Sequence, residues 1–378
     1  MKKVFISVGE ISGDNYASQL IKKIPEFQWT GITGPKMREA GCKSVENIEN
    51  ISVVGITEAI PKYFQIKKAF RKSVEQLDKG VDLLIVVDFP GFNLKLLEEA
   101  KKRNIKTVYF IAPQVWAWGK GRIPKIAKNT DVLISIWPFE KDIYRKYEGK
   151  NFKVEYVGHP LLDIIKTEEN ESSFRKKAGI LNEKKILGLF PGSRESEVKT
   201  LFPIMLKSAE IILKKENVHF VIPTTPNVES VVKGILKEFS HLPVSILDKK
   251  TFKNPSYEVM KHSYFSVIAS GTATLEASII GNPFLLVYKV SPLTFFIGKL
   301  LVSIDFLGLP NIIAKKEVIK ELLQKECSPE NIAKWSLRYL EDKALYEKTK
   351  KELEGVKNAL GEKGAIEKTA NIIKEIIS

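Results

Sequence analysis

Two acidic side chains stand just after apolar runs in the first half of the chain, where they could act on a hydroxyl group. Glu10 follows "KKVFISV" after one glycine, and Asp88 follows "LLIVV". Because five apolar residues precede Asp88, its carboxyl is expected at the edge of a buried sheet, where loss of water raises its basicity. A structural alternative, in which Asp88 caps the next helix, stays open. For Asp14 we prefer such a structural role, capping or supporting the first helix.

The second half of the chain carries strand ends that suit a diphosphate. Two short segments, each between an apolar strand and a predicted helix, consist of Gly192, Ser193 and Arg194 and of Ser270, Gly271 and Thr272. Backbone N–H groups at a helix N-terminus, together with hydroxyls and a guanidinium, bind phosphate oxygens. Glu276, further along the second helix, could accept hydrogen bonds from ribose hydroxyls. Anion-binding segments in one half and acids in the other indicate a glycosyltransferase that uses a nucleotide sugar.

A loop in the first half could add to the site. The segment "IAPQVWAWGKGR" places Trp116 and Trp118, then Lys120 and Arg122, after a predicted strand. The tryptophans either seal the edge of the domain or form a wall for a sugar or an acyl chain. His159, near the domain junction, either points into a cleft or packs within the junction.

The elements that must position these residues alternate between apolar strands and helices. Strands that are apolar on both faces predict parallel sheets covered on both sides, and ligands bind at the carboxyl ends of such strands. The pattern occurs twice and predicts an α/β chain with two Rossmann-like, doubly wound domains that face each other across a cleft. The predicted domains are 1–163 and 164–340. Helices in 341–378 are expected to pack back on the chain or exchange between subunits.

The composition limits the class of protein. The 378 residues include 60 Lys and Arg against 45 Asp and Glu, a net charge of +15. Such a charge suits nucleic acid, an anionic membrane or phosphorylated substrates, although an excess of surface lysine is a plain alternative. No apolar run is long enough to span a membrane. The two cysteines stand apart, which fits a reducing cytoplasm, and the four histidines lack metal-ligand spacing. We expect no metal and no cofactor.

An ordered set of motifs resembles the lipid-A-disaccharide synthase family. The motifs are "VGEISGD", "GPKMREAGC", "VDFPGFN", "PQVWAW", "PFEKDIYRKY", "VGHPLLD", "FPGSRESEV", "SGTATLE" and "LPNIIA". They span residues 8–314, and "IKELLQKEC" extends the similarity to residue 327. The resemblance implies an inverting GT-B glycosyltransferase. Its reaction moves a diacylglucosamine unit from UDP-2,3-diacylglucosamine to the 6-hydroxyl of 2,3-diacylglucosamine 1-phosphate, giving lipid A disaccharide 1-phosphate and UDP.

The resemblance also marks site residues. They are Glu10, Ser12 and Asp88 in the first domain and Arg194, Glu276 and Asn311 in the second. Asp88 is the expected base, and Glu10 either competes for that role or orients the acceptor sugar. Family members often carry a second acid in the segment where this chain has Gly91. A mechanism that needs a carboxylate pair in that segment is therefore weakened.

Substrates with acyl chains favour membrane contact by the basic, aromatic segment 53–74. Its candidate contact residues are Ile60, Phe64, Lys67, Lys68, Phe70 and Arg71. Basic amphipathic helices lie in membrane interfaces, although a helix with its apolar side in the core is the alternative. The segment 291–310 is a second candidate for membrane, acyl or subunit contact. We expect a cytoplasmic protein at the inner membrane that binds the two lipid substrates and no nucleic acid. A homodimer stays open.

Two other classes of function share parts of this pattern. One is another UDP-GlcNAc-dependent GT-B enzyme, an epimerase or a peptidoglycan glycosyltransferase, which would share the nucleotide-binding half. The other is a non-catalytic protein that binds a UDP-sugar or RNA. The "GEISGD" and "PQVWAW" segments favour the disaccharide synthase.

Overall fold

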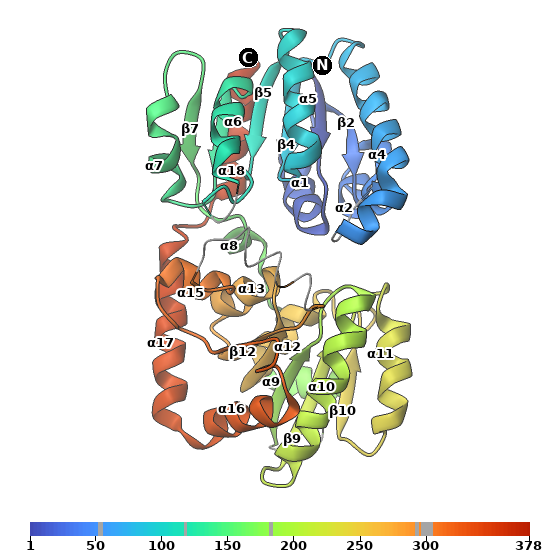
Figure 1. The fold of residues 1–378 in the computed structure, drawn as a ribbon, viewed down its shortest axis with the longest axis vertical. Coiled ribbons are helices and arrows are strands. Elements are labelled where there is room, and N and C mark those ends of the chain that lie inside the picture. The colour runs from blue at the N-terminus through green and yellow to red at the C-terminus, as the bar shows by residue number, and fades with distance from the viewer. Residues whose placement is uncertain (52–55, 117–118, 181–183, 292–294, 296–304) are drawn as a thin grey trace. The chain divides into compact units, whose positions relative to one another are not determined.

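The protein folds into two α/β units, each built on one parallel sheet (Figure 1). The computed structural model describes residues 1–51, 56–116, 119–180, 184–291, 295 and 305–378. The first unit consists of Met1–Asp163 and Leu360–Ser378, and the second of Ile164–Ala359.

The sheet of the first unit has seven parallel strands in the order β3-β2-β1-β4-β5-β6-β7. The strands are β1 (Lys3–Ser7), β2 (Gln28–Thr33), β3 (Lys43–Asn47), β4 (Leu83–Val87), β5 (Lys106–Phe110), β6 (Val132–Ser135) and β7 (Lys153–Tyr156). The chain first runs outward from β1 to β3 and then resumes at β4 on the other side of β1. This switch point between β1 and β4 is where open α/β sheets bind ligands.

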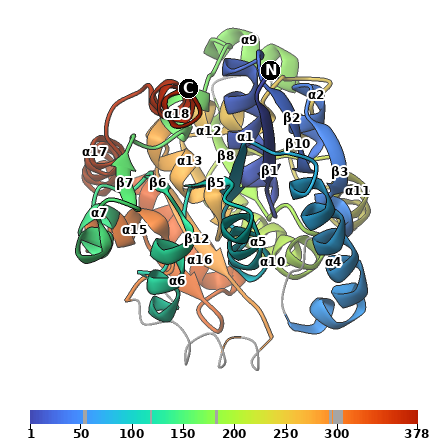
Figure 2. The ribbon, with the colours of Figure 1, turned by 90° about the horizontal axis from the view of Figure 1, so that it is seen from above.

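Helices cover both faces of the first sheet (Figure 2). The helices of this unit are α1 (Ile11–Lys23), α2 (Pro35–Glu39), α3 (Ile48–Ile51), α4 (Ile56–Leu77), α5 (Pro90–Lys102), α6 (Ile123–Asn129), α7 (Glu140–Tyr144) and α18 (Ala365–Ile376), and the short α8 (Leu161–Ile164) crosses into the second unit. Short 3₁₀ turns form at Lys120–Arg122 and Arg145–Tyr147. The C-terminal helix α18 packs against α1 of the same chain. The Asp163 carboxylate accepts hydrogen bonds from the backbone of Gly364, at 2.6 Å, and of Ile366, at 3.0 Å, and so fixes the start of α18.

The second unit repeats the plan with six parallel strands in the order β10-β9-β8-β11-β12-β13. The strands are β8 (Lys185–Phe190), β9 (Val218–Pro223), β10 (Val244–Leu247), β11 (Phe265–Ala269), β12 (Phe284–Tyr288) and β13 (Glu321–Leu323). Here the switch point lies between β8 and β11, which pair through Phe190 and Ile268. The two predicted anion-binding segments follow these two strands.

The last two helices of the second unit pack on earlier helices of the same unit. The helices of this unit are α9 (Glu171–Ala178), α10 (Glu195–Leu213), α11 (Glu229–Leu236), α12 (Pro255–His262), α13 (Thr272–Ile280), α15 (Leu309–Ala314), α16 (Pro329–Glu341) and α17 (Lys343–Ala359), with a 3₁₀ turn at Lys237–Phe239. Helix α16 packs along α10, and α17 contacts α13 and α15 (Figure 1). Within the described residues, no helix is long and apolar enough to cross a membrane.

The predicted fold class, two Rossmann-like parallel-sheet domains with a helical C-terminal segment, is confirmed. The central strands β4 and β11 are buried along their whole length, because helices cover both faces of each sheet. Each fully buried Val, Ile or Leu side chain there contributes about 1.5–3 kcal/mol relative to exposure. The outer strands β3 and β13 carry more polar residues, and the sequence pattern did not predict them.

Candidate active site

The carboxyl ends of β1 and β4 bring two predicted acids to the same edge of the first sheet. The strands are hydrogen-bonded neighbours, with Ser7 opposite Val86. The loop after β1 then packs closely on the loop after β4, since a Cβ at Gly9 would lie 2.3 Å from Cγ of Phe89. Only glycine fits this approach. Glu10, exposed at the N-cap of α1, and Asp88 therefore share this edge.

The backbone at Asp88 has an unusual conformation for residues other than glycine. Asp88 has φ 45° and Phe89 has φ 51°, both in the left-handed region, and Ile111 on the next strand end has φ 62°. Left-handed φ values are rare for such residues, and each costs of order 1–3 kcal/mol unless the surroundings hold it. Strain of this kind clusters at functional sites, which directs attention to this edge.

Long-range hydrogen bonds hold Asp88 in place. Its backbone N–H donates to the carbonyl of Ile111 at 3.0 Å. Its own carbonyl accepts from Nδ2 of Asn93 and from the hydroxyl of Tyr109, each at 2.8 Å. The N-cap of α5 is Phe89, and the helix has no side-chain cap. The alternative in which Asp88 caps that helix is therefore wrong.

The surroundings of Asp88 make its carboxyl a weaker acid than usual. Burial is the largest effect and, together with the nearby charge of Glu10, raises its pKa from 3.8 to about 7. A hydrogen bond from the Phe89 backbone and the positive charge of Arg122 act in the opposite direction. A carboxyl with a pKa near neutrality is suited to accept a proton from a hydroxyl group.

The other predicted residues of the first unit divide between the edge and the interior. Ser12 lies in the first turn of α1, half-buried. Asp14 is buried, and its carboxylate accepts from the backbone of Lys36 at 3.0 Å and of Met37 at 2.9 Å. Its structural role is confirmed, but the helix that it caps is α2 rather than the first helix.

Aromatic side chains fill the loops after β5, β6 and β7. The Trp116 ring packs at 5.4 Å from Phe139 and 6.4 Å from Trp137. His159 packs at 5.0 Å from Trp137, and burial lowers its pKa to about 3, so the ring is neutral. His159, which is buried, thus takes the packing role that the sequence left open, whereas Trp116 is half-buried and its role as a wall for a sugar or an acyl chain stays a prediction. Trp118 lies outside the described residues.

In the second unit, the segment after β8 exposes donors at the start of a long helix. Gly192 has φ 113°, a conformation that favours glycine. Ser193 and Arg194 are exposed, and Arg194 is the N-cap of α10. The Glu197 carboxylate accepts from the Ser193 backbone at 3.2 Å and from the Arg194 guanidinium at 2.8 Å.

The segment after β11 lies beside the first one, because β8 and β11 are neighbours. Gly271 is the N-cap of α13 with φ 155°, and Thr272 begins the helix. The backbone N–H of Ser270 donates to Val287 on β12 at 3.1 Å. Glu276 is half-buried, and the Tyr257 hydroxyl donates to its carboxylate at 3.1 Å. Both predicted anion-binding segments of the second unit thus meet at one edge.

Comparison with known proteins decides the family. The family described as lipid-A-disaccharide synthetase matches residues 4–376. A lipid-A-disaccharide synthase from Persephonella marina is 72% identical over 377 residues, covering 100% of this chain and 99% of that protein. Another, from Sulfurihydrogenibium sp., is 59% identical over 386 residues, covering 100% and 99%. The chain belongs to the lipid-A-disaccharide synthase family. It is a glycosyltransferase of lipid A biosynthesis, as the motifs predicted.

Solved structures support the GT-B fold of this family member. The UDP-GlcNAc 2-epimerase from Neisseria meningitidis, solved with UDP-GlcNAc bound, aligns with a TM-score of 0.64 and covers 99% of each chain. Its sequence identity is 15%, so this likeness concerns the fold. The relatives at 72% and 59% identity favour the synthase over the epimerase that was the alternative.

The family's motif residue Asn311 lies inside the second unit. Its Oδ1 accepts from the backbone of Val318 at 2.7 Å and of Ile319 at 2.9 Å. Its Nδ2 donates to the carbonyl of Ile319 at 2.9 Å and to Oε1 of Glu321 at 2.8 Å. Glu321 also accepts from the backbone of Gly308 at 2.9 Å. Asn311 thus clamps the start of α15, and its contact with substrate stays a prediction.

The sequence did not point to the groups that hold the Asp88 backbone. Asn93 belongs to the family's "VDFPGFN" motif, and its amide also accepts from the hydroxyl of Ser7 at 2.7 Å. Tyr109 is fully buried within β5. The sequence placed Arg122 near this edge, in the loop after β5. Only the structure shows that its positive charge lowers the pKa of Asp88. The signal that could have found Asn93 was its place in the "VDFPGFN" motif, five residues after Asp88.

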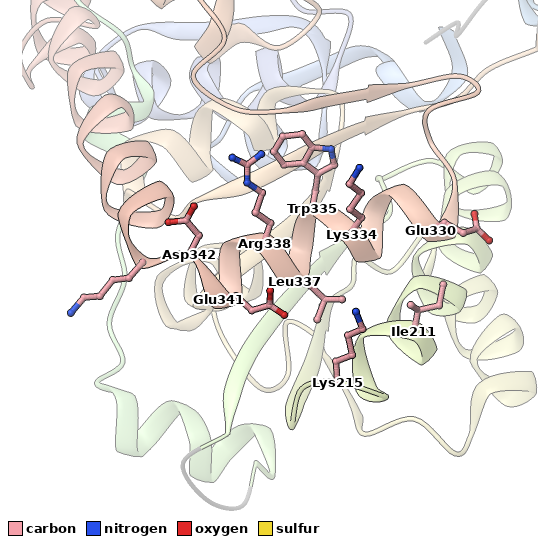
Figure 3. A pocket seen from close by; sticks show the side chains of 10 residues that line it. Ile211, Lys215, Glu330, Lys334, Trp335, Leu337, Arg338, Glu341 and Asp342 are labelled. Carbon is pink, nitrogen blue, oxygen red and sulfur yellow. The ribbon is translucent and has the colours of Figure 1, made fainter.

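A hollow lies away from this chemistry. It has a volume of about 860 Å³ and lies between α16 and the C-terminal end of α10, far along that helix from Arg194, with Trp335 and Arg338 in its lining (Figure 3). Among the described residues, no group of three or more His, Cys, Asp and Glu side chains is placed to hold a metal ion.

Proposed function

We propose that the chain transfers a diacylglucosamine unit from UDP-2,3-diacylglucosamine to the 6-hydroxyl of 2,3-diacylglucosamine 1-phosphate. The products are lipid A disaccharide 1-phosphate and UDP, with inversion at the transferred sugar. The observation that carries the chemistry is Asp88, a carboxyl with a pKa near 7 at the switch point of the first sheet. Membership of the lipid-A-disaccharide synthase family supports the choice of these sugars.

In the proposed reaction, Asp88 takes the proton from the 6-hydroxyl of the acceptor. The freed oxygen forms a bond to C1 of the donor sugar from the side opposite the diphosphate. The bond between C1 and the diphosphate oxygen breaks, and UDP leaves with the electron pair. Proton transfer to a positioned base contributes typically ~10²–10⁴-fold. Glu10 orients the acceptor sugar together with Ser12.

The second unit is proposed to hold the leaving UDP. Arg194 and the Ser193 backbone would bind phosphate oxygens at the start of α10, and the N-terminus of α13 would add backbone N–H groups. Glu276 would accept from ribose hydroxyls, as acids do in other nucleotide-binding folds. Positioned donors of this kind stabilise the negative charge that develops on the leaving group.

The reaction itself is tested with purified protein and both lipid substrates. We expect one disaccharide 1-phosphate and one UDP for each donor consumed. Consumption of the UDP-sugar without a disaccharide, or conversion to an isomeric UDP-sugar, would contradict the proposal and favour an epimerase. Binding of UDP-sugar without any turnover would favour a non-catalytic binding protein.

Helix α4 is proposed to bring the enzyme to an anionic membrane surface. Phe64 is 78% exposed and Tyr63 is 58% exposed, beside the exposed Lys67, Lys68 and Arg71. Phe70 instead packs on Phe92 of α5 at 5.4 Å, which fixes the helix to its own unit. The side chain of Ile60 and most of the segment 291–310 lie outside the described residues.

Vesicle sedimentation tests this membrane contact. Lys67→Glu, Lys68→Glu and Arg71→Glu together are expected to weaken binding to anionic vesicles by at least about a hundredfold, since each basic residue contributes ~1 kcal/mol. The matched control reverses the exposed Lys348, Lys351 and Lys357 of α17, which should change binding little. Equal loss in both variants would indicate net charge alone and remove α4 from the proposal.

A further inference from the structure

The diphosphate-binding segment of the second unit already holds a carboxylate. Both oxygens of Glu197 are engaged: Oε2 accepts from the Ser193 backbone at 3.2 Å, and Oε1 accepts from the Arg194 guanidinium at 2.8 Å. The segment is shaped around this side chain, because a Cβ at Gly192 would lie 2.5 Å from Oε2 of Glu197. The donors expected to bind a phosphate thus surround a negative charge from the protein itself.

A simple capping role explains part of this arrangement. A Glu at the third position of a helix often reaches back to the N-cap backbone and stabilises the first turn. Here, however, Glu197 reaches one residue further, to Ser193, and it also binds the side chain of the N-cap residue Arg194. Its contacts are therefore with the two groups that the proposed function assigns to the diphosphate.

We propose that Glu197 is an internal counter-ion that competes with the diphosphate for Ser193 and Arg194. With the site empty, it keeps the segment in its anion-binding form. When UDP-sugar binds, phosphate oxygens replace the carboxylate on these donors. The Glu197 side chain is 28% exposed, so water can receive it. After the reaction it returns to the donors and favours release of UDP. This inference rests on the proposed function of the segment.

The neighbouring residues fit a shared electrostatic site. Tyr288, at the end of β12, is half-buried, and its pKa is raised first by burial and then by the charge of Glu197, with Arg194 acting in the opposite direction. Glu195 lies in the same first turn of α10 but pairs with Lys199 at 2.9 Å. The chain therefore offers two acids in one turn, of which one faces the segment.

Calorimetric titration of UDP and of uridine tests the competition. In Glu197→Gln the amide oxygen can still accept from Ser193, so the cap remains while the charge is lost. We expect the Kd for UDP to fall roughly three- to fivefold, the upper part of the range for one exposed ion pair, and the Kd for uridine to stay unchanged. Inhibition of turnover by UDP should become stronger by a similar factor.

The matched control is Glu195→Gln, which removes the same charge from the same turn. It should leave UDP binding within twofold of the parent protein, and thermal unfolding checks that both variants are folded. Unchanged UDP affinity in Glu197→Gln, or an equal gain in Glu195→Gln, would overturn the competition. Failure of the proposed function looks different: UDP would then bind equally well to the parent and to Arg194→Ala.

Discussion

The two units place different chemistry at the same topological position. In each sheet the chain reverses its direction of growth beside the first strand, at β1 and β4 or at β8 and β11. The first unit puts the carboxyls of Glu10 and Asp88 there, and the second puts backbone N–H groups, hydroxyls and a guanidinium, with Glu197 as a partner of two of these donors. The plan of the fold therefore fixes where chemistry happens, while the residues after each strand decide what it is.

The backbone conformation at these strand ends also differs between the two units. The second unit reaches positive φ values with glycines, Gly192 and Gly271, at no steric cost to a side chain. The first unit uses Asp88, Phe89 and Ile111 at positive φ and holds the Asp88 turn with partly buried hydrogen bonds. A phosphate needs accessible amides, whereas a base needs one carboxyl in one place, and this requirement accounts for the strained turn.

The largest effect on the second unit is expected from Arg194→Ala. Loss of a donor to developing negative charge typically costs ~10²–10³-fold in turnover, and UDP should also bind more weakly. Lys199→Ala is the control, because it removes an equal, exposed charge near the start of the same helix without touching the segment. Normal turnover in Arg194→Ala would break the assignment of the diphosphate to this unit.

A smaller effect is expected where the first unit packs two loops together. In Gly9→Ala the new Cβ would overlap Phe89, so the loops after β1 and β4 must separate. We expect about 1–3 kcal/mol less stability and at least tenfold lower turnover, measured by thermal unfolding and by assay. Gly91→Ala is the control, since a Cβ there meets no described atom within 4 Å. Equal behaviour of both variants would contradict this packing.

The smallest effect concerns pH. A base acts only when ionised, so kcat/KM should rise as the pH rises through the pKa of Asp88, about 7. Glu10→Gln removes a like charge and should move this rise to lower pH, by less than about one unit. Arg122→Gln removes an opposite charge and should move it to higher pH. If Glu10→Gln instead abolishes turnover at every pH, Glu10 is the base.

The sequence pattern identified the fully buried central strands and missed β3, whose burial is partial. Strands β4 and β11 are apolar on both faces and were identified from that pattern. Strand β3 has Lys43 and Glu46 among half-buried neighbours and lacks the pattern. The fold class and the positions of the strand-end residues therefore followed from local sequence, and the outer strands depended on pairing with distant segments.

The site was predictable in its residues more than in its geometry. The rule that ligands bind at the ends of parallel strands placed Glu10 and Asp88 together. The left-handed turn at Asp88 depends on Asn93 and Tyr109, which reach it from other elements. The inward orientation of Asn311 depends likewise on Glu321, ten residues further on. Short motifs do not record such long-range bonds.

The most direct measurement follows turnover and UDP binding in Asp88→Asn. The fold should tolerate this change, because ionising Asp88 costs the folded state increasingly as pH rises from about 4 to about 7. The variant should thus be no less stable than the parent at pH 8. We predict turnover ~10²–10⁴-fold lower, with the Kd for UDP within twofold of the parent. Near-normal turnover, or loss of UDP binding together with turnover, would contradict the division of roles between the units.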